Sequence, residues 1–135
     1  MRFAVDRLDH LVVTCRDVTI SASWYQRVLG MDVEEFGEQN RTALKFGGQK
    51  INLRPAEATQ HEWWTGEAGG VPGTADLCFI VTVDADQIIA HLQQCGVTVA
   101  LGPVAKAGAL GPITSVYCRD PDGNLIEIST YGSVD

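Results

Sequence analysis

The sequence predicts an α+β fold, built from two tandem copies of the order strand, helix, strand, strand, strand. Segments 8–14 and 75–81 are both short and apolar, and an aspartate and a helical pattern follow each of them within a few residues. The spacing then repeats, since 20 residues separate His10 from Gly30 and also Asp76 from Gly96. Internal similarity at matched spacing is typical of a duplicated structural unit.

The first copy supplies its elements in order. The apolar strand at 8–14 is followed by a helix at about 20–29, where Trp24, Val28 and Leu29 recur at helical spacing. Gly30 ends this helix, because glycine readily adopts the left-handed conformation of a helix C-cap. Strands are then expected at 31–33, 40–46 and 49–54.

The second copy repeats this order with one interruption. A strand at 75–81 precedes a helix at about 86–95, which ends at Gly96. Strands are expected at 97–99, 114–119 and 124–129, and a stretch rich in Gly, Ala and Pro at 102–112 interrupts the copy.

The domain organisation follows from the size of the copies. Module 1 is expected at about 5–56, a linker at about 57–73, and module 2 at about 74–131. Neither half has enough residues to bury a core alone, so the sequence predicts a single domain over 1–135.

Charge and hydropathy exclude several partners. The chain has 10 Lys and Arg against 17 Asp and Glu, a net charge of −7. Because no basic run is present, we expect neither nucleic acid nor an anionic membrane as a partner. The first residues lack the apolar region of a signal peptide, and no apolar run reaches membrane-spanning length, so we expect a cytoplasmic protein.

The segment 119–129 is the most informative stretch of the chain. Pro121 and Gly123 favour a tight turn, and the alternating residues of 125–129 predict a strand. Glu127 would share one face with Leu125 and Ser129. A carboxylate at the centre of an apolar strand either points to solvent or lies in a cavity that holds a cation, and the strand alone leaves both possibilities open.

Four segments together resemble the vicinal oxygen chelate superfamily. They are Leu-Asp-His-Leu-Val-Val-Thr at 8–14, the Trp-Tyr pair at 24–25, Leu-Gly-Met at 29–31, and Arg-Asp-Pro-Asp-Gly-Asn at 119–124. This superfamily contains glyoxalase I, extradiol dioxygenases, fosfomycin-thiol transferases and bleomycin-resistance proteins. The segment Phe-Gly-Gly-Gln-Lys-Ile-Asn-Leu at 46–53 is most similar to its small glyoxalase-domain subgroup.

The resemblance implies a curled mixed sheet that encloses a cavity, and often a homodimer. It also implies a divalent metal ion held by residues on the first and last strand of each module. Matched position by position, these residues are His10 and Arg54 in module 1 and Asp76 and Glu127 in module 2.

Arg54 departs from this pattern. An arginine stays protonated and has no lone pair to offer, so it cannot be a metal ligand. His10, Asp76 and Glu127 remain, and one imidazole with two carboxylates suits Zn, Ni, Mn or Fe. Alternatively, Arg54 pairs with Asp76 or Glu127 and replaces the metal as the cation of the cavity, turns outward, or contacts an anionic substrate group.

Four further residues are candidates for substrate binding. Trp63 and Trp64 either cover a ligand cavity, make a dimer contact, or fill the core beneath the linker. Tyr117 and Arg119 share a strand face and would hold an anionic substrate there. In the alternative, Tyr117 belongs to the core and Arg119 closes the turn that follows it.

The resemblance therefore implies a metal-dependent lyase or isomerase that acts on a small oxygen-chelating substrate, with Glu127 as the catalytic residue that moves a proton. The alternative is a metal-free protein that binds or sequesters a small molecule, as bleomycin-resistance proteins do. A dioxygenase is a further alternative, less favoured in so short a chain.

Overall fold

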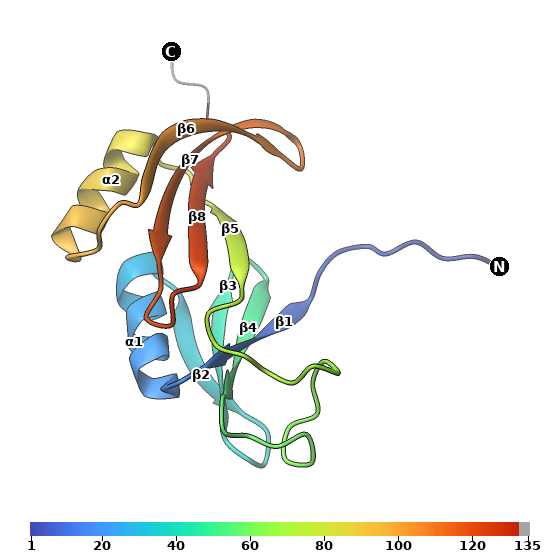
Figure 1. Cartoon of the computed structure of the whole chain (residues 1–135). Coiled ribbons are helices and arrows are strands. Elements are labelled where there is room, and N and C mark those ends of the chain that lie inside the picture. The colour runs from blue at the N-terminus through green and yellow to red at the C-terminus, as the bar shows by residue number, and fades with distance from the viewer. Residues whose placement is uncertain (133–135) are drawn as a thin grey trace. The chain divides into compact units, whose positions relative to one another are not determined.

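A computed structural model describes residues 1–132 of the chain (Figure 1). The chain forms two compact units that divide between Pro72 and Gly73. Each unit contains one helix and an open, mixed sheet of four strands. The predicted α+β fold of two βαβββ modules is therefore confirmed, and residues 57–72 of the expected linker belong to the first unit.

Unit 1 contains β1 and four further elements. Their bounds are β1 His10–Cys15, α1 Val18–Leu29, β2 Asp32–Phe36, β3 Arg41–Phe46 and β4 Gln49–Pro55. The strand order is β1-β4-β3-β2, with β1 parallel to β4 and the other pairs antiparallel. The helix connects β1 to the antiparallel strands, and this connection brings the first and last strands of the unit side by side.

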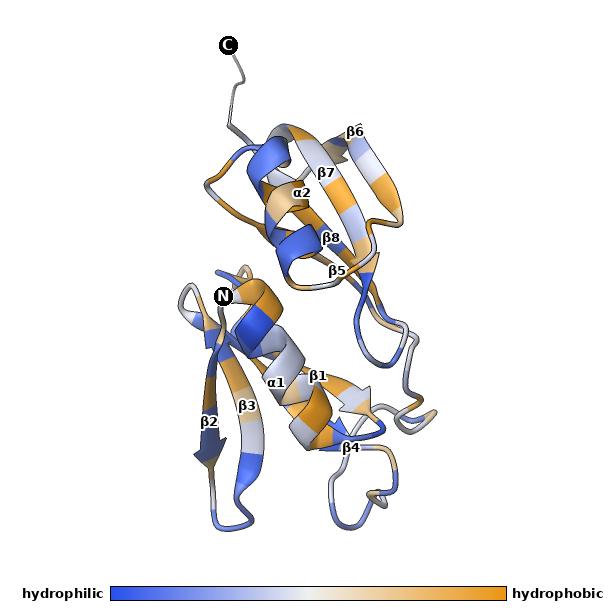
Figure 2. Ribbon diagram, turned by 90° about the vertical axis from the view of Figure 1, so that its left-hand side faces the viewer, coloured by the Kyte–Doolittle hydropathy of each residue, from blue (hydrophilic) through white to orange (hydrophobic). Residues whose placement is uncertain are grey.

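Helix α1 covers one face of this sheet. Its Tyr25 and Val28 are buried with Leu44, Ile51 and Leu53 of the strands. Asp17 caps the first turn by accepting a hydrogen bond from the Ile20 amide, and Gly30 ends the helix at φ 67°. In Figure 2 both helices carry apolar and polar residues together, as helices that pack on one side of a sheet do.

Unit 2 repeats the arrangement. Its elements are β5 Asp76–Ile80, α2 Ala85–Gln94, β6 Leu101–Gly108, β7 Gly111–Arg119 and β8 Leu125–Thr130. The strand order is β5-β8-β7-β6, and β5 is parallel to β8. Leu92 of α2 and Val116, Cys118 and Ile126 of the sheet are fully buried. Neither helix, nor any other among residues 1–132, is long and apolar enough to cross a membrane.

The expected strand at 97–99 is wrong, and the stretch 102–112 does not interrupt the module. Instead, Leu101–Gly108 forms β6, which pairs antiparallel with β7. Pro103 is tolerated because β6 is an edge strand, where a missing N–H costs no internal ladder bond. Pairing with the long strand β7 therefore makes Leu101–Gly108 a strand, although the Gly- and Ala-rich composition of this segment does not predict one.

The turn between β7 and β8 is held by a buried carboxylate. Asp120 is 6% exposed and accepts hydrogen bonds from the amides of Asp122 and Asn124, both at 2.9 Å, and from Asn124 Nδ2 at 2.7 Å. Asn124 Oδ1 in turn accepts from the Ala75 amide at 2.8 Å. The turn thus fixes where β8 begins and ties it to the start of β5.

Replacing Asp120 by alanine should destabilise the protein by about 2 kcal/mol or more, because three buried donors would lose their acceptor. Urea unfolding measures this change. The exposed Glu38, replaced by alanine, is the control and should change the free energy of unfolding by less than about 0.5 kcal/mol. Equal effects of the two substitutions would contradict this role of the turn.

Candidate functional site

The face of the unit 2 sheet that points away from α2 carries a cluster of polar residues. The strand register places Cys78, Glu127 and Tyr117 side by side across β5, β8 and β7. By the two-residue alternation of strands, the same face carries further polar residues. We call this set the unit 2 polar face; its members are Asp76, Cys78, Ser115, Tyr117, Glu127 and Ser129.

Hydrogen bonds fix the carboxylate of Glu127 at the centre of this face. Ser115 Oγ donates to Glu127 Oε2 at 2.6 Å and lies 2.7 Å from Ser129 Oγ. Ser129 Oγ also contacts Cys78 Sγ at 3.4 Å. Ser115 and Ser129 are fully buried, so the network is anchored in the sheet. A carboxylate has about four acceptor sites, which leaves Glu127 capacity for a ligand or proton.

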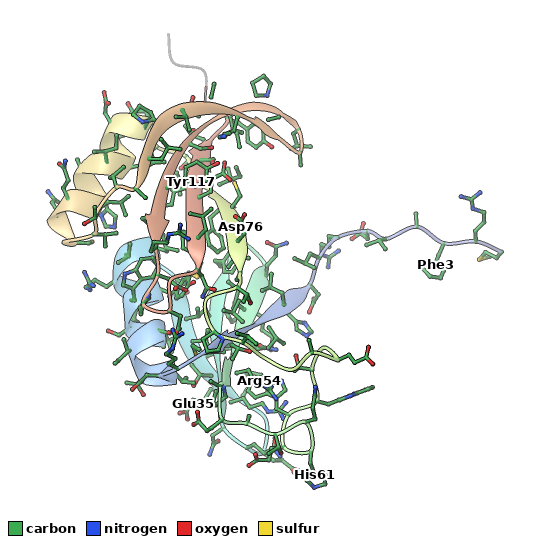
Figure 3. All side chains as sticks on the ribbon, viewed as in Figure 1. Phe3, Glu35, Arg54, His61, Asp76 and Tyr117 are labelled. Atoms are coloured by element: carbon green, nitrogen blue, oxygen red, sulfur yellow. The ribbon has the colours of Figure 1, made fainter. Side chains whose placement is uncertain are left out.

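Tyr117 is held in its protonated form. Loss of solvation, followed by its hydrogen bond to Glu127 and the charge of that carboxylate, raises the pKa of the phenol. A neutral phenol beside a carboxylate donates a hydrogen bond, so at neutral pH Tyr117 serves as a donor. Figure 3 shows Tyr117 and Asp76 on the strands of this unit.

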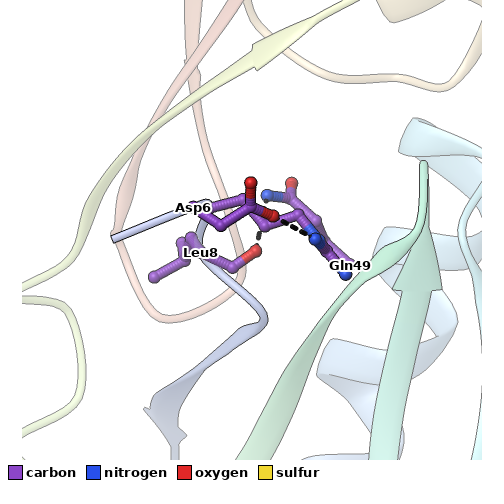
Figure 4. A network of polar contacts seen from close by, with 4 residues as sticks. Asp6, Leu8 and Gln49 are labelled. Carbon is purple, nitrogen blue, oxygen red and sulfur yellow. Dashed lines mark hydrogen bonds and ion pairs between the residues drawn. The ribbon is translucent and has the colours of Figure 1, made fainter. Parts of the chain in front are cut away.

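In unit 1, a hydrogen bond to the neighbouring Asp9 orients His10 at the start of β1. Its Nδ1 lies 2.8 Å from Asp9 Oδ2, and this hydrogen bond lowers the pKa of Asp9. Gln49 donates to the Leu8 carbonyl at 3.1 Å and fixes the preceding backbone (Figure 4). An ionised Asp9 can only accept, so His10 donates through Nδ1 and its Nε2 lone pair remains available to a ligand.

His10 belongs to a row of polar residues on the face of the unit 1 sheet that points away from α1. The parallel register pairs His10 with Lys50 and Thr14 with Arg54, and Asn52 lies between the two pairs. We call His10, Thr14, Lys50, Asn52 and Arg54 the unit 1 polar strip. Thr14, Asn52 and Arg54 are each less than 10% exposed.

Arg54 is the most deeply buried of these residues, at 2% exposure. Its Nε donates to the Trp63 carbonyl at 3.2 Å and its Nη2 to the Ala58 carbonyl at 2.8 Å. Within the described residues of its own unit it makes no ion pair. The guanidinium therefore holds the loop after β4 in place (Figure 3), and of the three positions considered for it, the outward-turned one is wrong.

The same loop returns to the strip at Gly70. A Cβ atom added there would collide with the Thr14 hydroxyl and would lie 2.7 Å from Arg54 Nη1. Only glycine allows this approach, so the backbone of the loop packs directly on the buried end of the strip.

The two neighbouring tryptophans of the loop after β4 differ in their exposure to solvent. Trp63 is buried at 7% exposure, and the Arg41 guanidinium lies over its ring, 4.0 Å from the centroid. Trp64 is 88% exposed. Trp63 also lines a hollow of about 580 Å³ together with Arg41, His61 and Glu62. Trp63 therefore fills the core beneath the loop, as in one of the alternatives for this pair.

The structure thus groups the candidate residues by unit. Asp76, Tyr117 and Glu127 share the unit 2 polar face, while His10 and Arg54 share the unit 1 polar strip. Within either unit of the described chain, no three His, Cys, Asp or Glu side chains are placed to hold a metal ion. The meeting of His10 with the two carboxylates stays a prediction.

Arg119 is exposed and donates to the Gly123 carbonyl at 3.3 Å, which closes the turn.

Sequence reasoning gave no role to Asp9 or to three members of the unit 2 polar face, namely Cys78, Ser115 and Ser129, although it placed Ser129 on the face of Glu127. The alternation of β7 and β8 was a usable signal for the serines, because it places Ser115 and Tyr117 on one face and Ser129 beside Glu127. The pairing that brings Ser115 to Glu127 required the strand register.

Comparison with known proteins identifies the family. A family model described as the Glyoxalase/Bleomycin resistance protein/Dioxygenase superfamily matches residues 7–128. The chain belongs to this superfamily, and the resemblance in the sequence is confirmed.

Two curated relatives and one further solved structure are similar over most of the chain. "Virulence protein STM3117" of Salmonella typhimurium is 44% identical over 97% of this chain and 88% of its own, and its crystal structure superposes with a TM-score of 0.89. "Glyoxalase domain-containing protein RDO1" of Mycosarcoma maydis is 46% identical over 96% of this chain and 71% of its own. The integron cassette protein VCH_CASS1 of V. cholerae is 43% identical over 98% of this chain and 100% of its own, with a TM-score of 0.91.

Replacing Arg54 by methionine should destabilise the protein by about 2–4 kcal/mol, because the Ala58 and Trp63 carbonyls lose charged donors. The loop 56–72 should also become cleavable by a protease under native conditions, as limited proteolysis followed by mass spectrometry would show. Arg119→Met removes one exposed bond and is the control, with little expected effect on either measurement. Unchanged stability in Arg54→Met would refute the anchoring role.

Proposed function

We propose that this protein is a metal-dependent enzyme of the lyase or isomerase class, acting on a small substrate that chelates a metal through adjacent oxygens. Membership of the superfamily supports this class of function. The observation that carries the proposal is the carboxylate of Glu127, which Ser115 fixes at 2.6 Å in the middle of a polar sheet face. Such a preorganised carboxylate suits both metal binding and proton transfer.

The donor set fits a divalent ion. His10 offers Nε2 because Asp9 occupies Nδ1, and Asp76 and Glu127 offer carboxylate oxygens. One imidazole and two carboxylates are suitable ligands for Zn, Ni, Mn or Fe and would balance the charge of a dication. When bound, the ion would supply Lewis acidity toward substrate oxygens. Arg54 contributes no ligand, since its guanidinium lacks a lone pair.

The protein's own groups then have distinct roles in the proposed reaction. Glu127 is the catalytic residue that accepts and returns a substrate proton, and Ser115 positions its carboxylate. Tyr117, protonated at neutral pH, donates its one hydrogen bond to Glu127 and is a candidate to contact the substrate through its ring and phenol oxygen. Trp64, exposed on the loop, is a candidate to contact the substrate, whereas Arg54 and Trp63 act indirectly by fixing that loop.

A second function is a metal-free protein that binds a small molecule. Arg54 favours this second function, because it occupies one of the four ligand positions implied by the resemblance. Its guanidinium is a cation that donates hydrogen bonds to two backbone carbonyls. Assembly as a homodimer and a cytoplasmic location are further proposals, which both functions share.

Metal content separates the two functions. Under the first, protein purified without chelator should contain about one divalent ion per chain by elemental analysis, and Glu127→Gln should lose it. Ser115→Ala should weaken metal binding by about 10- to 100-fold, as removal of a partner of a metal ligand does.

Glu35→Gln is the matched control, because Glu35 is an exposed carboxylate on β2 outside both polar faces (Figure 3). Its metal content should equal that of the wild type. Wild-type protein that binds no divalent ion, even after Zn, Ni, Mn and Fe are added, would exclude the enzyme proposal and leave the binding protein.

A further inference from the structure

The first residues of the chain are apolar along one edge and exposed throughout. Positions 1, 3 and 5 are Met, Phe and Val, whereas positions 2, 4 and 6 are Arg, Ala and Asp, which is the alternation of a strand with one buried face. Yet Phe3 is 91% exposed and Val5 is 83% exposed. Figure 3 shows Phe3 out on this segment, which we call the N-terminal arm and define as residues 1–8. The arm therefore has the pattern of a strand without a sheet that covers it.

The arm leaves unit 1 from a fixed point at the start of β4. Gln49 Nε2 donates to the Leu8 carbonyl at 3.1 Å, and the Lys50 amide donates to the Asp9 carbonyl at 3.3 Å. Because β4 begins at Gln49, the residues before Leu8 have no β4 residue beside them. Figure 1 shows them leaving the unit 1 sheet as an extended segment. The arm thus has an ordered root, and its apolar edge must be covered from outside this sheet.

An extended segment with one apolar edge gains most by pairing with the free edge of a sheet. The pairing satisfies its backbone hydrogen bonds and covers alternate side chains. The β2 edge of the same chain is poorly placed, since the strand order β1-β4-β3-β2 puts it about 14 Å from β1 across the sheet. Crossing the sheet would use about half of the arm's extended reach of roughly 26 Å. A second copy of the chain can present the same edge along the whole arm.

Among the edge strands of the two sheets, β2 suits the arm best. It pairs continuously with β3 over Asp32–Phe36 and contains neither proline nor glycine. The β6 edge, in contrast, is interrupted by Pro103 and by a register shift between Leu101 and Val104, and both hinder strand addition. On β2, Val33 is 37% exposed and offers the arm an apolar neighbour.

Charge favours the same pairing. Strand β2 carries three carboxylates, whereas β5 carries one and β1 carries none. Glu34 forms an ion pair with Lys45 at 3.9 Å, and the other two carboxylates of β2 have no ion pair among the described residues of unit 1. Arg2 of the arm is likewise a cation without an ion pair in that part of the chain. An edge lined by carboxylates accepts a basic segment and repels an acidic one.

We infer that the N-terminal arm adds as an extra strand to the β2 edge of a second copy of this chain, and that the two copies exchange their arms reciprocally. Arg2 then meets the acidic edge, and the apolar positions of the arm cover Val33. Reciprocal exchange closes the assembly at two copies, because each copy donates one arm and receives one. The inference goes beyond the proposed function and does not depend on it.

The affinity of the dimer tests this inference. Analytical ultracentrifugation over a concentration series should show a dimer for the wild type. Phe3→Asp places a charge on the apolar edge and should raise the dimer dissociation constant by about 10- to 100-fold, as loss of a buried aromatic anchor does. Ala4→Asp adds the same charge to the other edge of the arm and is the matched control, with the wild-type constant expected. Both residues are exposed in the single chain, so neither substitution should alter its far-UV circular dichroism.

A photochemical cross-link identifies the receiving strand. Phe3 is replaced by p-benzoylphenylalanine in unlabelled protein, which is mixed with ¹⁵N-labelled wild-type protein, left to exchange subunits and irradiated. Mass spectrometry should find peptides that join the unlabelled arm to residues 32–36 of the labelled chain.

Three results would overturn the inference. The first is a wild-type protein that stays monomeric up to the highest concentration of the series. The second is a Phe3→Asp dimer as tight as the Ala4→Asp dimer. The third is a cross-link that stays within one chain or reaches a strand other than β2.

Discussion

The two-sidedness of each sheet is the constraint on which the rest of this structure depends. A strand sends alternate side chains to opposite faces, and a single helix can cover only one of them. In both units the covered face is apolar and forms the core, as Leu44 and Ile51 do beneath α1 and Val116 and Ile126 do beneath α2. The other face is then free to carry polar groups without loss of core, and every candidate for chemistry on a strand lies there.

The unit 2 polar face and the unit 1 polar strip differ in how their buried polar groups are hydrogen-bonded. In unit 2 the buried hydroxyls of Ser115 and Ser129 satisfy one another and the carboxylate of Glu127, so that a potentially costly charge is held in a fixed position. In unit 1 the amide of Asn52 is left without a partner. A satisfied network positions a reactive group, whereas an unsatisfied acceptor costs stability. The duplicated architecture thus supports two faces of different chemical character.

Arg54 shows how a residue can change its role within a retained fold. Burial of a charge is expensive unless the charge is hydrogen-bonded, and the Ala58 and Trp63 carbonyls provide those bonds. The arrangement orders a loop that has no strand or helix of its own, with Gly70 packed against Thr14 and Arg54. A position that the family resemblance assigns to a metal ligand here stabilises the loop instead.

The sequence alone determined the duplicated βαβββ order, the helices, the sidedness of β8 and the superfamily, because these follow from local periodicity and from short segments such as 119–124. Only the tertiary structure decided that Leu101–Gly108 is a strand, since its partner β7 supplies the hydrogen bonds that its Gly- and Ala-rich composition does not predict. It likewise decided the partners of Arg54 and Glu127. Those contacts join residues on different strands or on a loop, and their distances depend on register and chain path, which no local pattern encodes.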